Sequence, residues 1–376
     1  MTPFNRPAFV GHELDYIRDA ISRGQLSGDG FYTRSCNAAI VRITESHAAL
    51  LTHSCTAALE MAALLAWIEP GDEVIMPSFT FVSTANAVVL RGGIPVFVDI
   101  DPETLNIDPA QAASAVTSRT KAIFAVHYAG MIAEMDELAR IRDDHGLILV
   151  EDAAQALGSR YKGRAAGSLG DLAAFSFLET KNIVSGEGGA LTINRPDLVE
   201  RAEVIREKGT NRSRFLQGQV DKYTWVDIGS SYLPGELIAA FLLGQLENID
   251  VLNARRLEIC GHYHEAFAPY QEIGRINLPK PQPNGTSNGH MFYLLMQDLR
   301  DRNAFIAHMR AKGISTPFHY VPLHSSPAGR IHARHVGNLS ATDDVSARLV
   351  RLPLFHTLTA AEQEVVIEVA TSYLKT

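Results

Sequence analysis

The chain has 376 residues, of which 34 are Lys or Arg and 42 are Asp or Glu, so its formal net charge is −8. Hydrophobic residues make up 46% and charged residues 20%, as in globular proteins rather than disordered or fibrous ones. Such a mildly acidic chain lacks the basic field that nucleic-acid binding needs, which argues against a nucleic-acid partner. At roughly 150 residues per domain, the length predicts two to three domains.

Cysteine usage and apolar stretches predict a cytoplasmic protein without a membrane span. The three cysteines, Cys36, Cys55 and Cys260, form neither a disulfide framework nor a CxxC pair, which fits a reducing compartment. No signal peptide is expected at the N-terminus. The longest strongly apolar stretch, 57–68, is too short to span a bilayer.

Between residues 50 and 193, short apolar runs alternate with helical patterns. The expected strands are mostly continuous apolar runs, as is typical of strands buried on both faces, and they lie at 73–76, 94–100, 122–127, 147–151, 171–177 and 189–193. The expected helices lie at 56–67, 81–91, 108–116 and 132–145. This alternation predicts an α/β fold with a large, mainly parallel sheet and helices on both faces.

The last third of the chain predicts a smaller α+β domain. From Glu236 to about Phe267, apolar residues recur at helical spacing, which predicts one long helix joining the two domains. A polar, Pro- and Gly-rich loop is expected at 279–289, followed by an apolar run, a helix near 301–312 and a final helix from about 359. We therefore divide the chain into a large domain, 1–245, which includes the N-terminal segment, and a small domain, 246–376.

Polar residues follow two of the expected strands, at the edge where α/β sheets bind ligands. Asp152 comes directly after the run LILVE, where an unpaired carboxylate would cost several kcal/mol of desolvation. Lys181 follows the strand at 171–177 and precedes the glycines of GEGG, as a Schiff-base lysine would. Each also has an ordinary explanation, a helix cap for Asp152 and a surface position for Lys181.

A third signal is the helix start Ser54-Cys55-Thr56-Ala57, because hydroxyls and free N–H groups at a helix N-terminus can bind phosphate. Alone it is also an ordinary cap. A phosphate cradle, a carboxylate for a cationic ring and an amine nucleophile are together the parts that pyridoxal phosphate (PLP) requires. GxGxxG, P-loop and HExxH motifs are absent from the sequence.

The stretch 149–191, LVEDAAQALGSRYKGRAAGSLGDLAAFSFLETKNIVSGEGGAL, resembles the signature of the nucleotide-sugar aminotransferases. The likeness covers nearly the whole chain. It implies PLP-dependent transferase fold type I, PLP as cofactor, and a homodimer with shared active sites. It also implies L-glutamate as amino donor, 2-oxoglutarate as co-product, and a 4-keto-6-deoxy sugar linked to a nucleoside diphosphate as acceptor, in the synthesis of surface polysaccharides such as lipopolysaccharide or enterobacterial common antigen.

The resemblance also implies a role for individual residues. Lys181 matches the lysine that binds PLP and moves the proton, and Asp152 matches the carboxylate on the pyridine nitrogen. Gln155 resembles the residue at the ring hydroxyl, and Phe81 falls where an aromatic stacks on the ring. The expected phosphate ligands are Thr56, the Ala57 backbone and Ser176.

One departure from the family concerns the subunit interface. Many members carry GYNYR where this chain has GSSYL at 229–233, so Ser231 replaces an Asn that reaches the cofactor phosphate of the neighbouring subunit. Ser can still donate a hydrogen bond, although it reaches less far. Leu178 stands where a His is common. Dehydratase relatives replace the lysine by His, and Lys181 argues against that branch.

Four residues are candidate substrate contacts. Lys208 and Arg212 could meet an anionic nucleotide or face solvent, and Tyr320 and His324 belong to the motif FHYVPLH. No metal site is expected, because the pairs His262/His264 and His319/His324 each lack the third ligand that a metal would need. Two alternatives stay open from the sequence: amination at C3 or with the opposite stereochemistry at C4, and a PLP-binding regulator without turnover.

Overall fold

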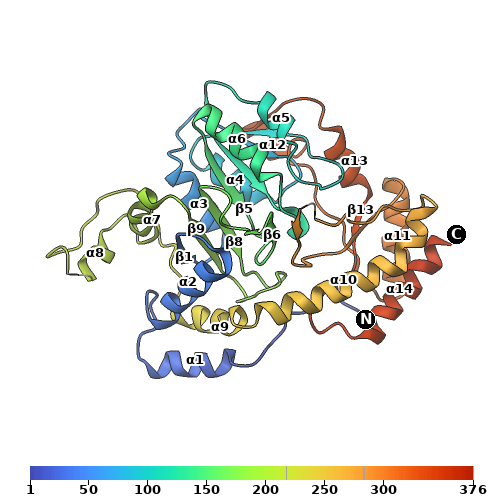
Figure 1. Ribbon diagram of the computed structural model, residues 1–376, viewed down its shortest axis with the longest axis horizontal. Helices are drawn as coiled ribbons and strands as arrows, with labels where there is room; N and C mark the ends of the chain where they lie inside the picture. The colour runs from blue at the N-terminus through green and yellow to red at the C-terminus, as the bar shows by residue number, and fades with distance from the viewer. Residues whose placement is uncertain (217, 283, 376) are drawn as a thin grey trace.

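The computed structural model describes residues 1–216, 218–282 and 284–375, and its centre is an eight-stranded sheet (Figure 1). The strand order is β1-β9-β8-β5-β4-β2-β3-β12. β9 runs antiparallel to β1 and β8, whereas the ladders from β8 to β12 are parallel. The bounds are β1 Ala48–Thr52, β2 Glu73–Pro77, β3 Ile94–Val98, β4 Thr120–Val126, β5 Ile148–Asp152, β8 Leu172–Ser176, β9 Gly189–Ile193 and β12 Arg334–His335.

The predicted α/β class is confirmed, and all six predicted strands belong to this sheet. The sequence did not reveal β1, an edge strand that pairs with β9, or β12, which has only two residues and adds to β3 from the far end of the chain. A strand of two residues leaves no periodic pattern to detect.

Helices cover both faces of the sheet (Figure 1), since successive strand residues such as Leu149 and Val150 belong to opposite hydrophobic clusters. One face carries α3 Cys55–Leu65, α4 Val82–Val89 and α7 Val199–Arg206. The other carries α2 Phe31–Thr44, α5 Pro109–Ser114, α6 Met135–His145 and α9 Glu236–Leu246, with α1 Glu13–Ser22 packed against α9. The short helix α8 Arg212–Leu216 extends away from the sheet (Figure 1).

The single long helix predicted from residue 236 is wrong in one respect: it is two helices, α9 and α10 Ile249–Glu272, bent by 60°. The Asn248 side chain donates to the Gly244 carbonyl at 2.8 Å at the break. Leu246 and Leu252 pack in the cluster on the sheet, whereas Tyr263 packs in a separate C-terminal cluster. Because Leu252 and Tyr263 both belong to α10, this helix packs on both cores.

The C-terminal part is built on a small sheet of β11 Tyr293–Leu295 and β13 Leu349–Arg351. The predicted helices near 301–312 and from 359 are confirmed as α11 and α14. The helices of this part are α11 Leu299–Ala311, α12 Pro327–His332, α13 Ser340–Arg348 and α14 Ala360–Leu374. A small three-stranded sheet is formed by β6 Arg160–Tyr161, β7 Arg164–Ala165 and β10 Gly285–Thr286. Two 3-10 turns complete the fold, η1 Tyr128–Gly130 and η2 Pro196–Leu198. The domain boundary at 245/246 stays a prediction.

The first five residues connect the C-terminal part to the loop that follows β8. The Thr2 N–H donates to Gly313 at 2.9 Å, and Phe4 accepts from the Leu354 N–H at 3.3 Å. Asn5 Nδ2 donates to the Glu179 carbonyl at 2.8 Å. This segment was assigned to the large domain from the sequence, yet its first residues bond to the C-terminal part.

No single helix within the described ranges has both the length and the apolar composition to cross a membrane; α9 and α10 meet that test only jointly, across their bend. The described His, Cys, Asp and Glu side chains form no group of three that could hold a metal ion.

Candidate active site

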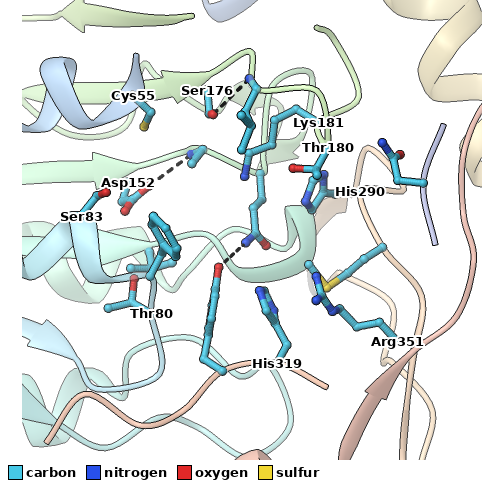
Figure 2. A pocket seen from close by; sticks show the side chains of 18 of the residues that line it. Cys55, Thr80, Ser83, Asp152, Ser176, Thr180, Lys181, His290, His319 and Arg351 are labelled. Atoms are coloured by element: carbon cyan, nitrogen blue, oxygen red, sulfur yellow. Dashed lines mark hydrogen bonds between the residues drawn. The ribbon is translucent and has the colours of Figure 1, made fainter. Parts of the chain in front are cut away.

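A cavity of about 600 Å³ lies at the carboxyl ends of the parallel strands, between the sheet and loops of the C-terminal part. Asp152 ends β5, Ser176 ends β8, and His319 and Arg351 face them from the C-terminal side (Figure 2). This is the edge at which open α/β sheets bind their ligands. Seven of the twelve predicted site residues line it: Thr56, Phe81, Asp152, Gln155, Ser176, Lys181 and Tyr320.

Lys181 projects into this cavity from the loop after β8 (Figure 2). The loop is closed by backbone bonds, including Lys181 N–H to Leu178 at 2.9 Å and Ser185 N–H to Phe177 at 2.8 Å. Burial lowers the pKa of the Lys181 amine, and the charge of Asp152 opposes that shift. The neutral amine is therefore populated at lower pH than on a surface lysine, which a nucleophile or proton carrier needs.

Asp152 is the second charged group of the cavity. Its Oδ2 accepts from the Thr84 hydroxyl at 2.7 Å and its Oδ1 from the Ala154 N–H at 3.3 Å. Burial raises the pKa of this carboxyl, while the two hydrogen bonds and the charge of Lys181 act to lower it. Such a carboxyl can pair with a protonated ring nitrogen, because a cation beside it would favour the charged carboxylate.

The N-terminus of α3 forms the third part of the site. Ser54 caps this helix, its Oγ accepting from the Ala57 N–H at 3.1 Å. The phosphate contact expected of the Ala57 backbone stays a prediction. The described hydrogen bonds leave the N–H groups of Cys55 and Thr56 without an acceptor. The Thr56 hydroxyl lies 2.8 Å from that of Ser83 and lines the cavity.

Glycines allow the strand after the lysine loop to pass close to this helix start. A Cβ on Gly189 would lie 2.3 Å from the carbonyl carbon of Ser54 and 2.4 Å from the Cys55 nitrogen. Gly186 adopts φ +81°, in the left-handed region. The glycine cluster therefore brings β9, which follows Lys181 in the chain, against the phosphate-binding end of α3.

Gln155, Tyr320 and Phe81 line the part of the cavity between the lysine and the C-terminal loops. Gln155 Oε1 accepts from the Ala129 N–H at 2.7 Å, and its Nε2 donates to the Tyr320 hydroxyl at 3.0 Å. The amide is thereby fixed, with one Nε2 hydrogen left to donate. Phe81 is half-exposed at the start of α4, its ring 6.4 Å from that of Tyr320.

Besides Ala57, four predicted residues do not line the cavity of their own chain: Lys208, Arg212, Ser231 and His324. Ser231 is exposed, Lys208 pairs with Glu207 at 3.5 Å, and Arg212 pairs with Glu207 at 3.3 Å. The expected cofactor contact of Ser231, which would be made in a neighbouring subunit, stays a prediction.

His324 does not line the cavity, and its expected substrate contact stays a prediction. Its N–H donates to Ser78 Oγ at 3.0 Å, and that hydroxyl lies 2.8 Å from His324 Nδ1. These contacts hold the loop that carries Tyr320 against the end of β2.

Sequence reasoning missed Arg351 and His290. Arg351 stands alone among apolar residues in the run LVRLPLF, and a single charge in such a run is a signal that could have found it. His290 donates from Nδ1 to Asn182 Oδ1 at 2.9 Å, since both Nδ2 hydrogens of Asn182 are donated elsewhere. Burial holds the pKa of His290 well below its usual range, so its Nε2 is an acceptor.

Cys55 lines the cavity at the start of α3. Burial raises the pKa of its thiol, and the nearby charge of Asp152 adds to that effect. The cysteine therefore stays a neutral thiol rather than a reactive thiolate.

The family model of the DegT/DnrJ/EryC1/StrS aminotransferases matches residues 8–371. The chain belongs to this family. Among solved structures, the aminotransferase TlmJ from Streptoalloteichus hindustanus is 30% identical, with a TM-score of 0.91, covering 100% of this chain and 99% of that one. DesV from S. venezuelae, in complex with a ketimine intermediate, is 31% identical with a TM-score of 0.87 and the same coverage. The sugar aminotransferase Spr1654 from Streptococcus pneumoniae, in its PMP form, is 25% identical with a TM-score of 0.92, again covering 100% and 99%.

This aminotransferase is therefore a PLP-dependent sugar transaminase of fold type I, as the sequence resemblance implied. Its own residues fit the cofactor. Free N–H groups on Cys55 and Thr56, with the Thr56 and Ser176 hydroxyls, would hold the phosphate, and Asp152 would hold the ring nitrogen. Gln155 would donate to the ring oxygen, and Lys181 would bind the cofactor covalently.

The approach of β9 to α3 yields a prediction for PLP affinity. In Gly189→Ala, the new methyl group must displace the Ser54–Cys55 backbone, so we expect PLP to bind about 10-fold more weakly or worse, the scale of one lost charge-assisted hydrogen bond. Titration of the apoprotein by absorbance measures this. The matched control is Gly261→Ala in α10, where a Cβ meets nothing within 4 Å, and its PLP affinity should be unchanged. Wild-type affinity in Gly189→Ala would contradict the close-approach argument.

The lowered pKa of Lys181 predicts how cofactor uptake depends on pH. Only the neutral amine reacts with PLP, so the uptake rate of the apoprotein should rise with pH and reach half its maximum below the ordinary lysine value of about 10.4. Because the charge of Asp152 stabilises the ammonium form, Asp152→Asn should move this midpoint to still lower pH. Stopped-flow absorbance, with Lys181→Ala as background for surface lysines, gives the midpoint. A midpoint above that of free lysine would show that burial does not control the amine.

Proposed function

We propose that this aminotransferase converts dTDP-4-dehydro-6-deoxy-D-glucose to dTDP-4-amino-4,6-dideoxy-D-galactose, with L-glutamate as amino donor and 2-oxoglutarate as co-product. The observation that carries the transamination is the convergence of Lys181, Asp152 and the start of α3 on one cavity. The choice of sugar rests on sequence, since the segments IREKGTNR and VDKYTWVDIGSSYL resemble those of enzymes that make this amino sugar.

The chain's own groups divide the work of the reaction. When bound, PLP supplies an electron sink for the carbon that loses or gains a proton. In each half-reaction Lys181 Nζ would move a proton between the substrate carbon and the cofactor carbon, away from the donor in the first and onto the sugar in the second, which requires the neutral amine favoured by burial. Asp152 would keep the ring nitrogen protonated, Gln155 would donate to the ring oxygen, and Phe81 would pack against the ring.

The active unit in this proposal is a homodimer. Residues 208–231 carry exposed apolar side chains, including Trp225 at 79% and Tyr223 at 56% exposure, a surface that favours burial against a second copy. In such a pair Ser231, Lys208 and Arg212 would reach the partner's cavity and bring hydrogen-bond donors and positive charge to anionic ligands. We place the reaction in the cytoplasm, because the described cysteines are free thiols.

The decisive experiment is a panel of nucleotide 4-keto and 3-keto sugars, tested for 2-oxoglutarate release with L-glutamate and for product structure by NMR. We expect turnover with dTDP-4-dehydro-6-deoxy-D-glucose and an amino group at C4 in the galacto configuration. Amination at C3, or with the opposite configuration at C4, would overturn the assigned sugar but not the transaminase.

Lys181→Ala should abolish turnover, and Asp152→Asn should lower it by about 10²-fold, the scale of a key electrostatic contact.

The shared site predicts a dimer that is needed for activity. Sedimentation of the active protein should give a dimer, and an active monomer would contradict the proposed shared active site. Ser231→Ala should weaken PLP binding by about 10-fold, the effect of one lost hydrogen bond to a charged group. Ser230→Ala, at the neighbouring exposed position, should bind PLP as the wild type does.

A further inference from the structure

His290 presents a hydrogen-bond acceptor to the cavity that holds Lys181. Both side chains project into this cavity (Figure 2). Burial lowers the pKa of the His290 ring, and among the neighbouring charges that of Lys181 contributes most to the same shift, so the two groups are close in space. In the part of the chain that the structure describes, neither Lys181 Nζ nor His290 Nε2 has a hydrogen bond to a protein group. A buried donor and a buried acceptor in one cavity are each expected to have a partner.

The ring of His290 is held in one tautomer by Asn182, the residue that follows Lys181. Both hydrogens of the Asn182 amide are donated, to Asn253 Oδ1 at 2.8 Å and to the Asn288 carbonyl at 2.9 Å. Asn182 Oδ1 can therefore only accept, and it lies 2.9 Å from His290 Nδ1. The proton of the neutral ring is thus on Nδ1, and the free lone pair is on Nε2.

The helix α10 fixes the loops that carry His290 and Lys181. Asn253 of this helix accepts from Asn182, and Arg256 of the same helix donates from Nη2 to the His290 carbonyl at 2.6 Å. His290 Nε2 therefore has a set position relative to the backbone of Lys181, and the long lysine side chain is the part that can adjust to it.

The ring stays an acceptor because nothing beside it would stabilise a positive charge. The charged and titratable groups that face it are Lys181, Arg256, His319 and Arg351. Burial and the charges of these groups hold the pKa of His290 well below its usual range. A proton on the Lys181 amine therefore stays on Nζ, since the ring is too weak a base to take it.

The other acceptors of the cavity already have a partner or an assigned role. Asp152 accepts from the Thr84 hydroxyl and the Ala154 N–H, and its carboxylate is assigned to the ring nitrogen of the cofactor. His319 is joined through Nδ1 to the Tyr128 hydroxyl at 3.0 Å. His290 Nε2 is therefore the best placed acceptor for the lysine amine.

We propose that His290 is a positioning residue for Lys181: its Nε2 accepts a hydrogen bond from the Lys181 amine whenever that amine is not bonded to the cofactor. This rests on the proposed role of Lys181 as the proton carrier. A free lysine side chain has several rotatable bonds, so a fixed acceptor limits the positions that Nζ can take while it exchanges protons. The bond also favours the ammonium form, so it partly offsets the effect of burial on the amine.

The first test is the pH dependence of PLP uptake by the apoprotein, which needs no sugar. Removing an acceptor that stabilises the ammonium form should lower the midpoint in His290→Leu by about one pH unit, the scale of one hydrogen bond to a charged group. His290→Gln, whose amide oxygen can take the place of Nε2, should restore the wild-type midpoint. The matched control is His262→Leu, at an exposed histidine of α10, which should leave the midpoint unchanged.

The second test is single-turnover reaction of the PLP-loaded protein with L-glutamate deuterated at the α-carbon. In His290→Leu the maximal rate should fall about 10- to 100-fold, the scale of a misplaced reacting group, while the half-maximal glutamate concentration stays within about 2-fold of wild type. The deuterium isotope effect should rise, because proton transfer then limits the rate more fully. His290→Gln should recover most of the rate.

A third measurement leaves His290 in place, so it does not depend on how its variants fold. Nitrogen NMR of histidine-labelled apoprotein should show the His290 Nε2 resonance shifted between wild type and Lys181→Ala. The Nδ1 resonance, bonded to Asn182, should stay where it is. Loss of both resonances in His290→Gln assigns them.

An Nε2 resonance that Lys181→Ala does not move would overturn the inference, as would an unchanged uptake midpoint in a folded His290→Leu. A higher half-maximal glutamate concentration at unchanged maximal rate would also overturn it, because His290 would then contact the substrate. The proposed role of Lys181 fails separately if Lys181→Ala still forms a covalent bond to PLP that borohydride traps. Thermal unfolding of each variant shows whether it is folded.

Discussion

The site depends on holding an amine and a carboxylate, Lys181 and Asp152, in one desolvated cavity. Burial acts on the two groups in opposite directions, lowering the pKa of the amine and raising that of the carboxyl, while the charge of each partly offsets the shift of the other. At a given pH, a larger fraction of each group is therefore uncharged than would be in water. A base that must give up and regain a proton, and a carboxylate that must stabilise a cationic ring, both use this condition.

The fold provides this cavity through the geometry of its sheet. Parallel strands end at one edge, so β5 and β8 deliver Asp152 and Ser176 to the same place, and the antiparallel strand β9 returns past the lysine loop to meet the start of α3. The far wall comes from the C-terminal part, which α10 joins to the large sheet because this helix packs on both cores.

In the proposed function, the anionic ligands bind at separate parts of the molecule, so a net charge of −8 is compatible with binding them. The helix start at Cys55 and Thr56 offers backbone N–H groups, and Arg351 offers an unpaired guanidinium on the opposite wall. Lys208 and Arg212 stand outside the cavity of their own chain, beside the exposed apolar side chains of residues 208–231. Net charge is a property of the whole surface, whereas binding depends on the few cations that face the ligand.

The sequence by itself determined the α/β class, the six central strands, the cofactor and the residues at strand ends, because continuous apolar runs and the motifs after them are local features of the chain. It could not determine that the connector would bend between α9 and α10, that Ser54 would accept from the Ala57 N–H, or that His324 would bond to Ser78. It also gave no role to Arg351, which lies 170 positions after Lys181 in the numbering of the chain. Those outcomes depend on contacts between residues far apart in sequence, and only the packing of the C-terminal part against the sheet edge decides which of them face the cavity.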